Sequence, residues 1–298
     1  MIDDDENSQS ATNDAFDLLR QIAEKRLARG RLTVVDATNL NIEDRRPLLR
    51  LAQKHHAAPV AIILDVDKET CQQRNAARPE RQGLTRRVLE KQVAALKKTL
   101  ESIRREAFYR VHILSRPEAI DAATVQRERM RADRCEEKGP FDIIGDVHGC
   151  CEELEQLLAK LGYARDEKLV WRHPEGRRAV FLGDVINRGP RSLDTLRLVM
   201  GMVKAGAAFL VPGNHELLFL RWISGETFAP EHGLRQTLNE IDALSAEEWA
   251  RLKAEAGSFL KSLESHLILD GGHLVVAHAG MTNELAGRIG VRRFALYG

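Results

Sequence analysis

The sequence has no long apolar run and no cysteine pattern that would support disulfide bonds. No stretch comes near the roughly 18 consecutive apolar residues of a membrane-spanning helix, and no charged-then-apolar leader follows Met1. We therefore expect a cytoplasmic protein without a membrane partner. Cys71 and Cys135 are isolated and Cys150 and Cys151 are adjacent, which is poor geometry for a bridge, so we expect free thiols.

A strong net charge is also missing. The formal net charge of +1 provides no global field that would attract a nucleic acid, so RNA or DNA binding would have to depend on local patches. The 298 residues are 43% hydrophobic and 30% charged, which is typical of one large or two ordinary globular domains.

Strands and helices alternate in the first 120 residues. Apolar, β-branched runs at 31–36, 59–65 and 111–114 predict strands, whereas 14–28 and 44–55 have helical spacing. Residues 1–13 are acidic and polar, and we expect a loop there. The alternation predicts an α/β domain with a parallel sheet over residues 1–120.

Two stretches of this first domain are candidates for binding phosphates. Asp36 and Asn39, in DATN, follow a predicted strand at the end where open α/β sheets bind ligands, although a plain polar turn explains them equally well. Arg74, Arg78 and Arg81, in RNAARPERQ, lie on successive helical turns, and such a cluster can close over phosphates as a lid. A solvated basic helix is the alternative for these arginines, and composition alone favours it.

Residues 121–139 are almost all charged or small, and their charges alternate in sign. This pattern predicts an exposed connecting helix that ends at Gly139-Pro140. We therefore place a domain boundary there, with a second domain over residues 140–298.

In the second domain, polar side chains follow four predicted strands, in the segments FDIIGDVHG, RAVFLGDVINRG, AAFLVPGNHE and HLVVAHAG. Carboxylate oxygens and imidazole nitrogens both suit a divalent metal such as manganese, iron or zinc. The polar residues that follow these strands are, in order, Asp146 and His148, Asp184, Asn214 and His215, and His278.

The motifs GDVHG, GDVINRG, GNHE and VVAHAG, in this order, resemble those of the calcineurin-like metallophosphoesterases. The resemblance implies an αββα sandwich with two divalent metals, for which we expect manganese, with nickel, iron or zinc as alternatives. It also implies that Asp146, His148 and Asp184 hold one ion, and that Asp184, Asn214 and His278 hold the other.

The same resemblance implies that Arg188 clamps the phosphate and that His215 protonates the leaving oxygen. This sequence differs from the family in two places. Asn187 stands where the family has a carboxylate, and no downstream GHTP-like segment supplies a further histidine. Because an amide cannot raise the pKa of an imidazole as an anion does, we expect a weakened acid catalyst, and replacing Asn187 by Asp should raise turnover on poor leaving groups.

Together with DATN and the RNxxRPxR arginines, these motifs resemble the bacterial RNA-repair polynucleotide kinase-phosphatases. That family joins a P-loop 5′-kinase to a metallophosphoesterase that acts on RNA 2′,3′-cyclic phosphate and 3′-phosphate ends, usually with a C-terminal ligase-like module. The phosphate loop GxxxxGK[ST] is missing here, so we expect a truncated, loosely packed P-loop-kinase-like sheet without kinase activity. On this interpretation the chain is a fragment cut at both ends, ATP is a ligand only of the full-length parent, and a homodimer is left open.

The expected function is metal-dependent phosphomonoesterase and 2′,3′-cyclic phosphodiesterase activity that heals RNA 3′ ends. Two alternatives stay open. One is a Ser/Thr protein phosphatase or dinucleoside polyphosphatase of the same superfamily, and the other is a non-catalytic fragment that binds RNA ends. A mostly helical segment, 217–263, follows GNHE and is expected to shape access to the metals.

Overall fold

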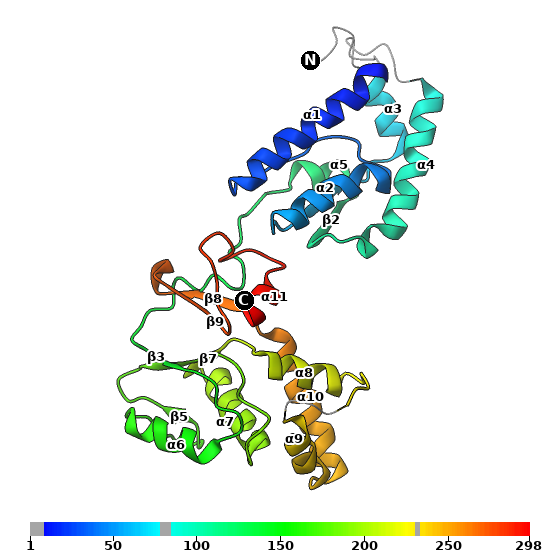
Figure 1. Ribbon diagram of the computed structural model, residues 1–298. Coiled ribbons are helices and arrows are strands. Elements are labelled where there is room, and N and C mark those ends of the chain that lie inside the picture. Colours follow the sequence, from blue (N-terminus) through cyan, green and yellow to red (C-terminus); the bar gives the residue numbers. More distant parts are fainter. Residues whose placement is uncertain (1–8, 78–84, 230–232) are drawn as a thin grey trace. The chain divides into compact units, whose positions relative to one another are not determined.

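The computed structural model describes residues 9–77, 85–229 and 233–298 and divides the chain into two units (Figure 1). One unit comprises Met1–Glu128 with Arg288–Gly290, and the other comprises Arg129–Gly287 with Val291–Gly298. The predicted α/β class is confirmed, because each unit combines helices with parallel strands. In the described ranges, no helix has the length and apolar character needed to cross a bilayer.

The first unit is built on two parallel strands, β1 (Val60–Leu64) and β2 (Arg110–Leu114). They confirm the strands predicted at 59–65 and 111–114. The helices of this unit are α1 (Gln9–Ala28), α2 (Ile42–Lys54), α3 (Lys68–Ala76), α4 (Arg86–Ser102) and α5 (Pro117–Asp121), and the short 3-10 helix η1 (Ile103–Arg105) follows α4.

Two local predictions for this unit are wrong. Residues 31–36 form no strand, because the described part of the unit offers no ladder beyond the β1–β2 pair, and Val34 is 82% exposed. Helix α1 begins at Gln9, inside the stretch expected to be a loop, because no proline or glycine interrupts the chain between there and Ala28.

Packing in the described part of the first unit is sparse, as expected. Parallel strands are usually covered on both faces, yet the residues on one face of β1 are each about half exposed to solvent. The exposed side chains of that face are Val60, Ile62 and Leu64. The buried apolar side chains of the described unit are Ala23, Ala52, Leu89 and Ile103.

The helix predicted for residues 121–139 is absent, and that prediction is wrong. After α5 ends at Asp121 the chain forms turns and extended segments, with one bridge from Asp133 to Ile268. The N–H of Arg134 donates to the Ile268 carbonyl oxygen, and the Ile268 N–H donates to Ala132, both over 2.8 Å. Backbone groups that would have closed a helix instead pair with a strand distant in the sequence.

The second unit contains a parallel sheet in the order β3–β6–β7 and a separate antiparallel pair, β8–β9. The strand predicted before His278 is therefore confirmed as β9, but it lies outside the parallel sheet. The strands are β3 (Phe141–Ile144), β4 (Ala164–Arg165), β5 (Trp171–Arg172), β6 (Arg178–Phe181), β7 (Ala208–Leu210), β8 (His266–Leu269) and β9 (Leu274–Ala277). The helices are α6 (Cys151–Lys160), α7 (Ser192–Lys204), α8 (Asn214–Ile223), α9 (Leu234–Asp242), α10 (Ala246–Ser262) and α11 (Arg292–Tyr297), with the short 3-10 helix η2 (Asp270–Gly272) between β8 and β9.

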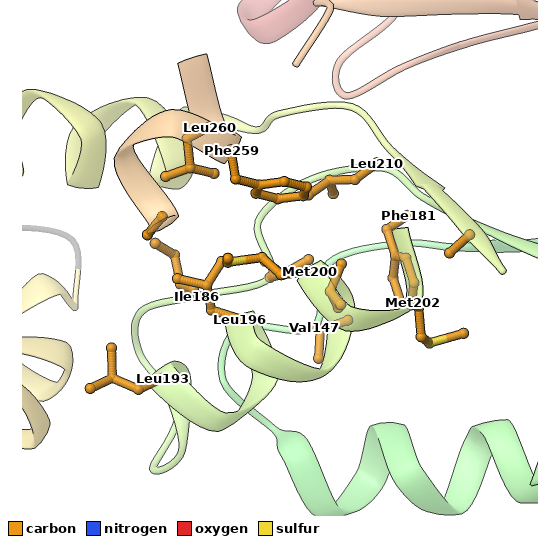
Figure 2. Close-up of a cluster of buried hydrophobic side chains, with 14 of the residues drawn as sticks. Val147, Phe181, Ile186, Leu193, Leu196, Met200, Met202, Leu210, Phe259 and Leu260 are labelled. Carbon is orange, nitrogen blue, oxygen red and sulfur yellow. The ribbon is translucent and has the colours of Figure 1, made fainter. Parts of the chain in front are cut away.

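Side chains of β6 alternate between two apolar clusters. Phe181 belongs to a cluster that includes Leu196 of α7 and Phe259 of α10 (Figure 2). Val180 belongs to the other cluster, with Val276 and other side chains of the β8–β9 pair. Burying an apolar side chain of this size contributes about 1.5–3 kcal/mol. The parallel sheet is thus packed on both faces, and the turns at its strand ends emerge from a fixed core.

Candidate metal centre

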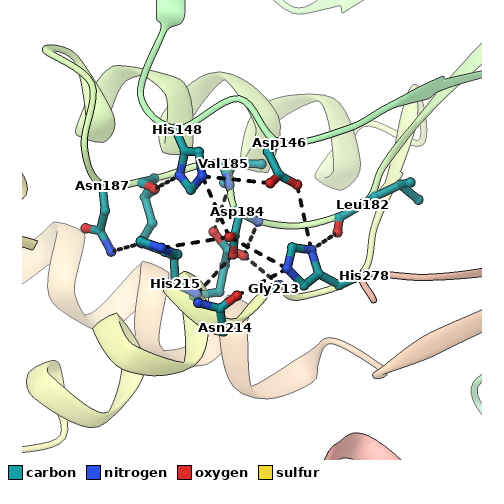
Figure 3. A network of polar contacts seen from close by, with 12 residues as sticks. Asp146, His148, Leu182, Asp184, Val185, Asn187, Gly213, Asn214, His215 and His278 are labelled. Atoms are coloured by element: carbon teal, nitrogen blue, oxygen red, sulfur yellow. Dashed lines mark hydrogen bonds and ion pairs between the residues drawn. The ribbon is translucent and has the colours of Figure 1, made fainter. Parts of the chain in front are cut away.

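The polar residues at the strand ends meet at one place in the second unit (Figure 3). Asp184, in the turn after β6, lies at the centre of this group and is almost completely buried. Its Oδ2 atom lies 3.8 Å from His148 Nε2, 3.9 Å from His215 Nε2 and 3.6 Å from His278 Nε2. Three imidazole nitrogens from three different turns therefore converge on one carboxylate oxygen.

Backbone carbonyls set the orientation of two of these rings. His148 Nδ1 lies 3.3 Å from the Ile186 carbonyl oxygen, and His278 Nδ1 lies 2.7 Å from the Leu182 carbonyl oxygen. A carbonyl can only accept, so each Nδ1 carries the ring hydrogen and each neutral Nε2 presents a lone pair. Metal-binding histidines are commonly held in this way.

The lone pairs of these two rings face other acceptors. His148 Nε2 lies 3.8 Å from Asp146 Oδ2, and His278 Nε2 lies 3.2 Å from Asn214 Oδ1. Acceptors that face acceptors repel one another unless a positive charge lies between them. The donor set of imidazole nitrogens with carboxylate and amide oxygens therefore fits divalent cations. Two sets of three side chains could each hold a metal ion, and Asp184 belongs to both. The first set also contains His148 and His215, and the second also contains Asp146 and His278.

All five predicted metal ligands are thus brought together. His148 Nε2 faces Asp146 and Asp184, and His278 Nε2 faces Asp184 and Asn214, which agrees with the division expected from the family. The assignment of each residue to one ion stays a prediction.

Glu216, a residue to which the sequence analysis gave no role, holds two of these turns together. Its buried carboxylate accepts hydrogen bonds from the N–H groups of Asp184, Val185 and Gly213 over 2.7, 2.9 and 2.7 Å. Burial, followed by the negative charge of Asp184, raises the pKa of Glu216 to about 7, against the opposing effect of the three N–H donors. A cation beside Asp184 would relieve part of this repulsion, which is a second indication that the site suits a metal.

Glycine is required where these turns approach each other. Gly183 has a φ of +94°, and a Cβ atom there would collide with the backbone of Gly213. A Cβ atom on Gly213 would collide with the Asp184 carboxylate. The Gly-Asp and Gly-Asn pairs of the two motifs therefore allow the close approach on which the metal centre depends.

Left-handed backbone conformations are concentrated at this site. The φ angles are +48° at His148, +49° at Asp184 and +68° at both Asn187 and Arg188. Residues other than glycine adopt this conformation at a cost of about 1 kcal/mol or more, and such residues often cluster at functional sites.

The third histidine has a different partner. His215 Nδ1 lies 3.1 Å from Asn187 Nδ2, and Asn187 Oδ1 accepts a hydrogen bond from Thr237 Oγ1 over 2.7 Å. All three side chains are fully buried. The backbone N–H of His215 also donates to Asp184 Oδ1 over 3.0 Å, which fixes the start of α8 against the central carboxylate.

Arg188 lies in the same loop as Asn187, and its side chain is exposed. Its backbone N–H donates to the Gly233 carbonyl oxygen over 3.1 Å. The backbone that carries the guanidinium is therefore anchored, and the role of Arg188 as a phosphate clamp stays a prediction.

The candidate residues of the first unit are less well defined. Asp36 is exposed. Asn39 has a φ of +39°, and its carbonyl oxygen accepts a hydrogen bond from the Arg45 guanidinium. Arg74 lies on α3 and is exposed, whereas Arg78 and Arg81 fall outside the described residues. The phosphate-binding roles of these residues stay predictions.

Two further supporting residues lie outside every motif. Thr237 and Glu240 lie one turn apart on α9, where Thr237 contacts Asn187 and Glu240 contacts the first two residues of α7, just after the loop that carries Asn187 and Arg188. No local sequence signal identifies them, because their roles depend on where α9 packs. The four cysteines are free, as expected.

Comparison with known proteins gives two family matches. Residues 139–291 match the model of the calcineurin-like phosphoesterases, and residues 2–103 match the model of an AAA domain. The expected order, a P-loop-like region followed by a phosphoesterase domain, agrees with this arrangement.

Among curated proteins, the chain is similar to bis(5′-nucleosyl)-tetraphosphatases named PrpE. It is 41% identical over 160 residues to that of Halalkalibacterium halodurans and 40% identical over 163 residues to that of Bacillus subtilis strain 168. Each match covers 53% of this chain and 65% of the relative, so the chain spans less than two thirds of these proteins. A solved serine/threonine phosphatase from Saccharomyces cerevisiae aligns with 44% of this chain and 35% of its own, with 19% identity and a TM-score of 0.26.

Proposed function

Because this chain belongs to the calcineurin-like phosphoesterases, we propose that its metal centre hydrolyses phosphoanhydride bonds of dinucleoside polyphosphates. The observation that carries the proposal is the 41% identity to a protein named as an asymmetrical bis(5′-nucleosyl)-tetraphosphatase. This similarity supports the dinucleoside polyphosphatase alternative of the sequence analysis better than its principal expectation, the healing of RNA 3′ ends.

The leaving groups of the two reactions differ in whether they have to be protonated as they depart. Hydrolysis of an RNA 3′-phosphate expels a sugar oxygen, which is strongly basic and has to be protonated. Hydrolysis of a phosphoanhydride expels a phosphate oxygen, which is stable as an anion. Asn187, in place of a carboxylate next to His215, weakens acid catalysis and therefore favours the second reaction.

The residues of the site have distinct roles in the proposed reaction. Asp146, His148, Asp184, Asn214 and His278 would hold two divalent metals, for which manganese is our first choice. When bound, such a pair of ions lowers the pKa of a water molecule and offsets charge on the phosphate.

Around these ions, Arg188 would bind two phosphate oxygens and His215 would donate a hydrogen bond from Nε2. The water oxygen would bond to phosphorus and release a proton to the solvent, while the bond between phosphorus and the bridging oxygen breaks and that oxygen leaves with the second nucleotide.

The test is a comparison of substrates with the purified chain and added manganese. Diadenosine tetraphosphate, an RNA oligonucleotide with a 3′-phosphate, a 2′,3′-cyclic phosphate and a phosphoserine peptide would be assayed in parallel. We expect the dinucleotide to be hydrolysed fastest, and we expect Asp184→Asn to abolish the activity. Faster release of phosphate from the RNA or from the peptide would overturn the proposal.

One observation favours a second candidate, the healing of RNA 3′ ends. An AAA-domain match precedes the phosphoesterase match, which agrees with the kinase-then-phosphatase order expected from the RNA-repair family. The RNA arms of the same assay decide between the two candidates.

A further inference from the structure

We propose that Thr237 fixes the orientation of the Asn187 side chain and thereby keeps the ring hydrogen of His215 on Nε2, which faces the metal centre. The inference rests on the proposed function, because it concerns the leaving groups that this site can serve. Thr237 touches no reacting atom, so it is a positioning residue.

The hydrogen bonds determine where the ring hydrogen lies. Thr237 Oγ1 donates to Asn187 Oδ1 over 2.7 Å, so the amide oxygen is turned toward α9. The amino nitrogen, Nδ2, then faces His215 Nδ1 at 3.1 Å. An amino group only donates, so Nδ1 has to accept and the hydrogen of the neutral ring lies on Nε2.

The reverse orientation of the amide is disfavoured by Thr237. It would place Nδ2 against Thr237 Oγ1, so that the hydroxyl would accept a hydrogen bond instead of donating one. Among the residues that the structure describes, Thr237 Oγ1 has no hydrogen-bond partner besides Asn187. Its hydrogen would then be buried without an acceptor, which costs free energy.

Other contacts keep Asn187 within reach of Thr237. The Glu240 carboxylate, one turn along α9, accepts from the N–H groups of Ser192 and Leu193 over 2.7 and 2.9 Å. Ser192 Oγ in turn accepts from the Asn187 N–H over 2.9 Å. Helix α9 therefore holds both the backbone and the side chain of the loop that follows β6.

The placement of the hydrogen has a chemical consequence. His215 Nε2 lies 3.9 Å from Asp184 Oδ2, so its hydrogen points toward the space where a phosphate would bind. A neutral ring donates this hydrogen in a hydrogen bond but does not release it, because release would leave an imidazolate anion. Such a ring assists a leaving group that departs as a stable anion, and phosphoanhydrides supply leaving groups of that kind.

The first experiment locates the hydrogen without any activity assay. Long-range ¹H–¹⁵N spectra of the metal-free full chain, with labelled histidine, would be recorded at pH 8 for wild type, T237S and T237V. We expect a protonated Nε2 and a bare Nδ1 at His215 in wild type and in T237S, and a mixture of ring forms in T237V. A wild-type ring protonated at Nδ1, or a T237V spectrum that is unchanged, would overturn the proposal.

The N187D variant keeps the spectroscopic test decisive if T237V does not fold. A carboxylate next to Nδ1 can only accept, so Nδ1 should become protonated, and the negative charge should favour the imidazolium form in which both ring nitrogens carry a hydrogen. Retention of the wild-type pattern in N187D would show that residue 187 does not control the ring.

The second experiment measures how kcat depends on the leaving group. The ratio of kcat for phenyl phosphate to kcat for 4-nitrophenyl phosphate should rise on the order of tenfold in N187D, rise less in T237V and stay at the wild-type value in T237S. An equal fall of both rates in T237V would indicate a merely structural role and would overturn the proposal. If wild type shows the expected ring form but hydrolyses no dinucleoside polyphosphate, the proposed function fails while the inference about Thr237 stands.

Discussion

The carboxylate of Glu216 accepts the backbone N–H of Asp184 over 2.7 Å, and this contact joins the turns that follow β6 and β7. The same carboxylate accepts from Val185 and Gly213, so one buried acid orders the backbone on both sides of the central metal ligand. The fixed positions of the ligands therefore depend on a residue that contacts no proposed ion.

We expect Glu216→Gln to lower the free energy of unfolding by about 2–3 kcal/mol. The amide nitrogen would be placed against backbone N–H groups that have no other acceptor among the residues the structure describes, and buried donors without partners are costly. Urea unfolding followed by circular dichroism measures this loss. Glu226→Gln is the matched control, because Glu226 forms an exposed pair with Arg221 and its loss should cost less than about 0.5 kcal/mol. Equal effects of the two variants would contradict the role given to Glu216.

Manganese binding should depend strongly on Asp184. Isothermal titration with manganese chloride is expected to show affinity reduced about 10- to 100-fold in Asp184→Asn, because an amide lacks the charge on which three histidines converge. Glu167→Gln, an exposed change between β4 and β5, serves as the control and should bind as wild type does. Unchanged binding by Asp184→Asn would remove this residue from the metal centre.

Arg188→Lys should lower kcat/KM about tenfold in the hydrolysis assay. Lysine keeps the positive charge but cannot contact two phosphate oxygens at once with a planar group. Arg191→Lys is the matched control, since Arg191 lies in the same loop and pairs with Asp194 and Glu152. A fall of equal size in both variants would point to a general effect of charge on the loop.

His266 should contribute a loss of stability as the pH decreases below about 6.5, whereas the raised pKa of Glu216 acts in the opposite direction over the same range. His266 is buried, its Nε2 accepts the Gly287 N–H over 2.8 Å, and burial lowers its pKa from 6.5. Below pH 6.5 the unfolded chain takes up a proton that the folded chain refuses, which favours unfolding until the pH passes below the folded pKa.

Urea unfolding of wild type and of His266→Gln at pH 7.5 and pH 5.5 measures this contribution as the difference between the two pH dependences, which we expect to be about 1 kcal/mol. His266→Gln should remove that part of the pH dependence, whereas the exposed His273→Gln should keep it. An identical change of stability between the two pH values in wild type and in His266→Gln would show that His266 makes no contribution.

The part of the metal centre that could be predicted from the sequence is the part encoded locally. Each ligand follows an apolar strand and precedes a small-residue turn, so the segments around Asp146, Asp184, Asn214 and His278 were recognisable one by one. The meeting of the first three follows from parallel pairing of β3, β6 and β7, since parallel strands bring their carboxyl ends to the same edge, whereas His278 follows β9 of the antiparallel pair.

What could not be predicted depends on contacts between distant segments. Residues 31–36 have the composition of a strand but find no partner strand in the described unit, and residues 121–139 have a helical charge pattern but pair partly with β8. Thr237 contacts Asn187 across 50 positions of sequence. Neither the composition around Thr237 nor its spacing from any motif indicates that contact.

The left-handed conformations at Asn187 and Arg188 destabilise the folded backbone, but they allow functional side chains to stand at these positions. Glycine adopts such angles without strain, so Arg188→Gly would relieve the backbone while removing an exposed functional side chain, whereas glycine at position 187 would also leave the buried Thr237 hydroxyl without its acceptor. A laboratory selection that rewards heat resistance alone would therefore have an easy route to an inert protein. Variants that gain thermal tolerance and keep their activity would have to come from other regions, such as the exposed apolar face of β1.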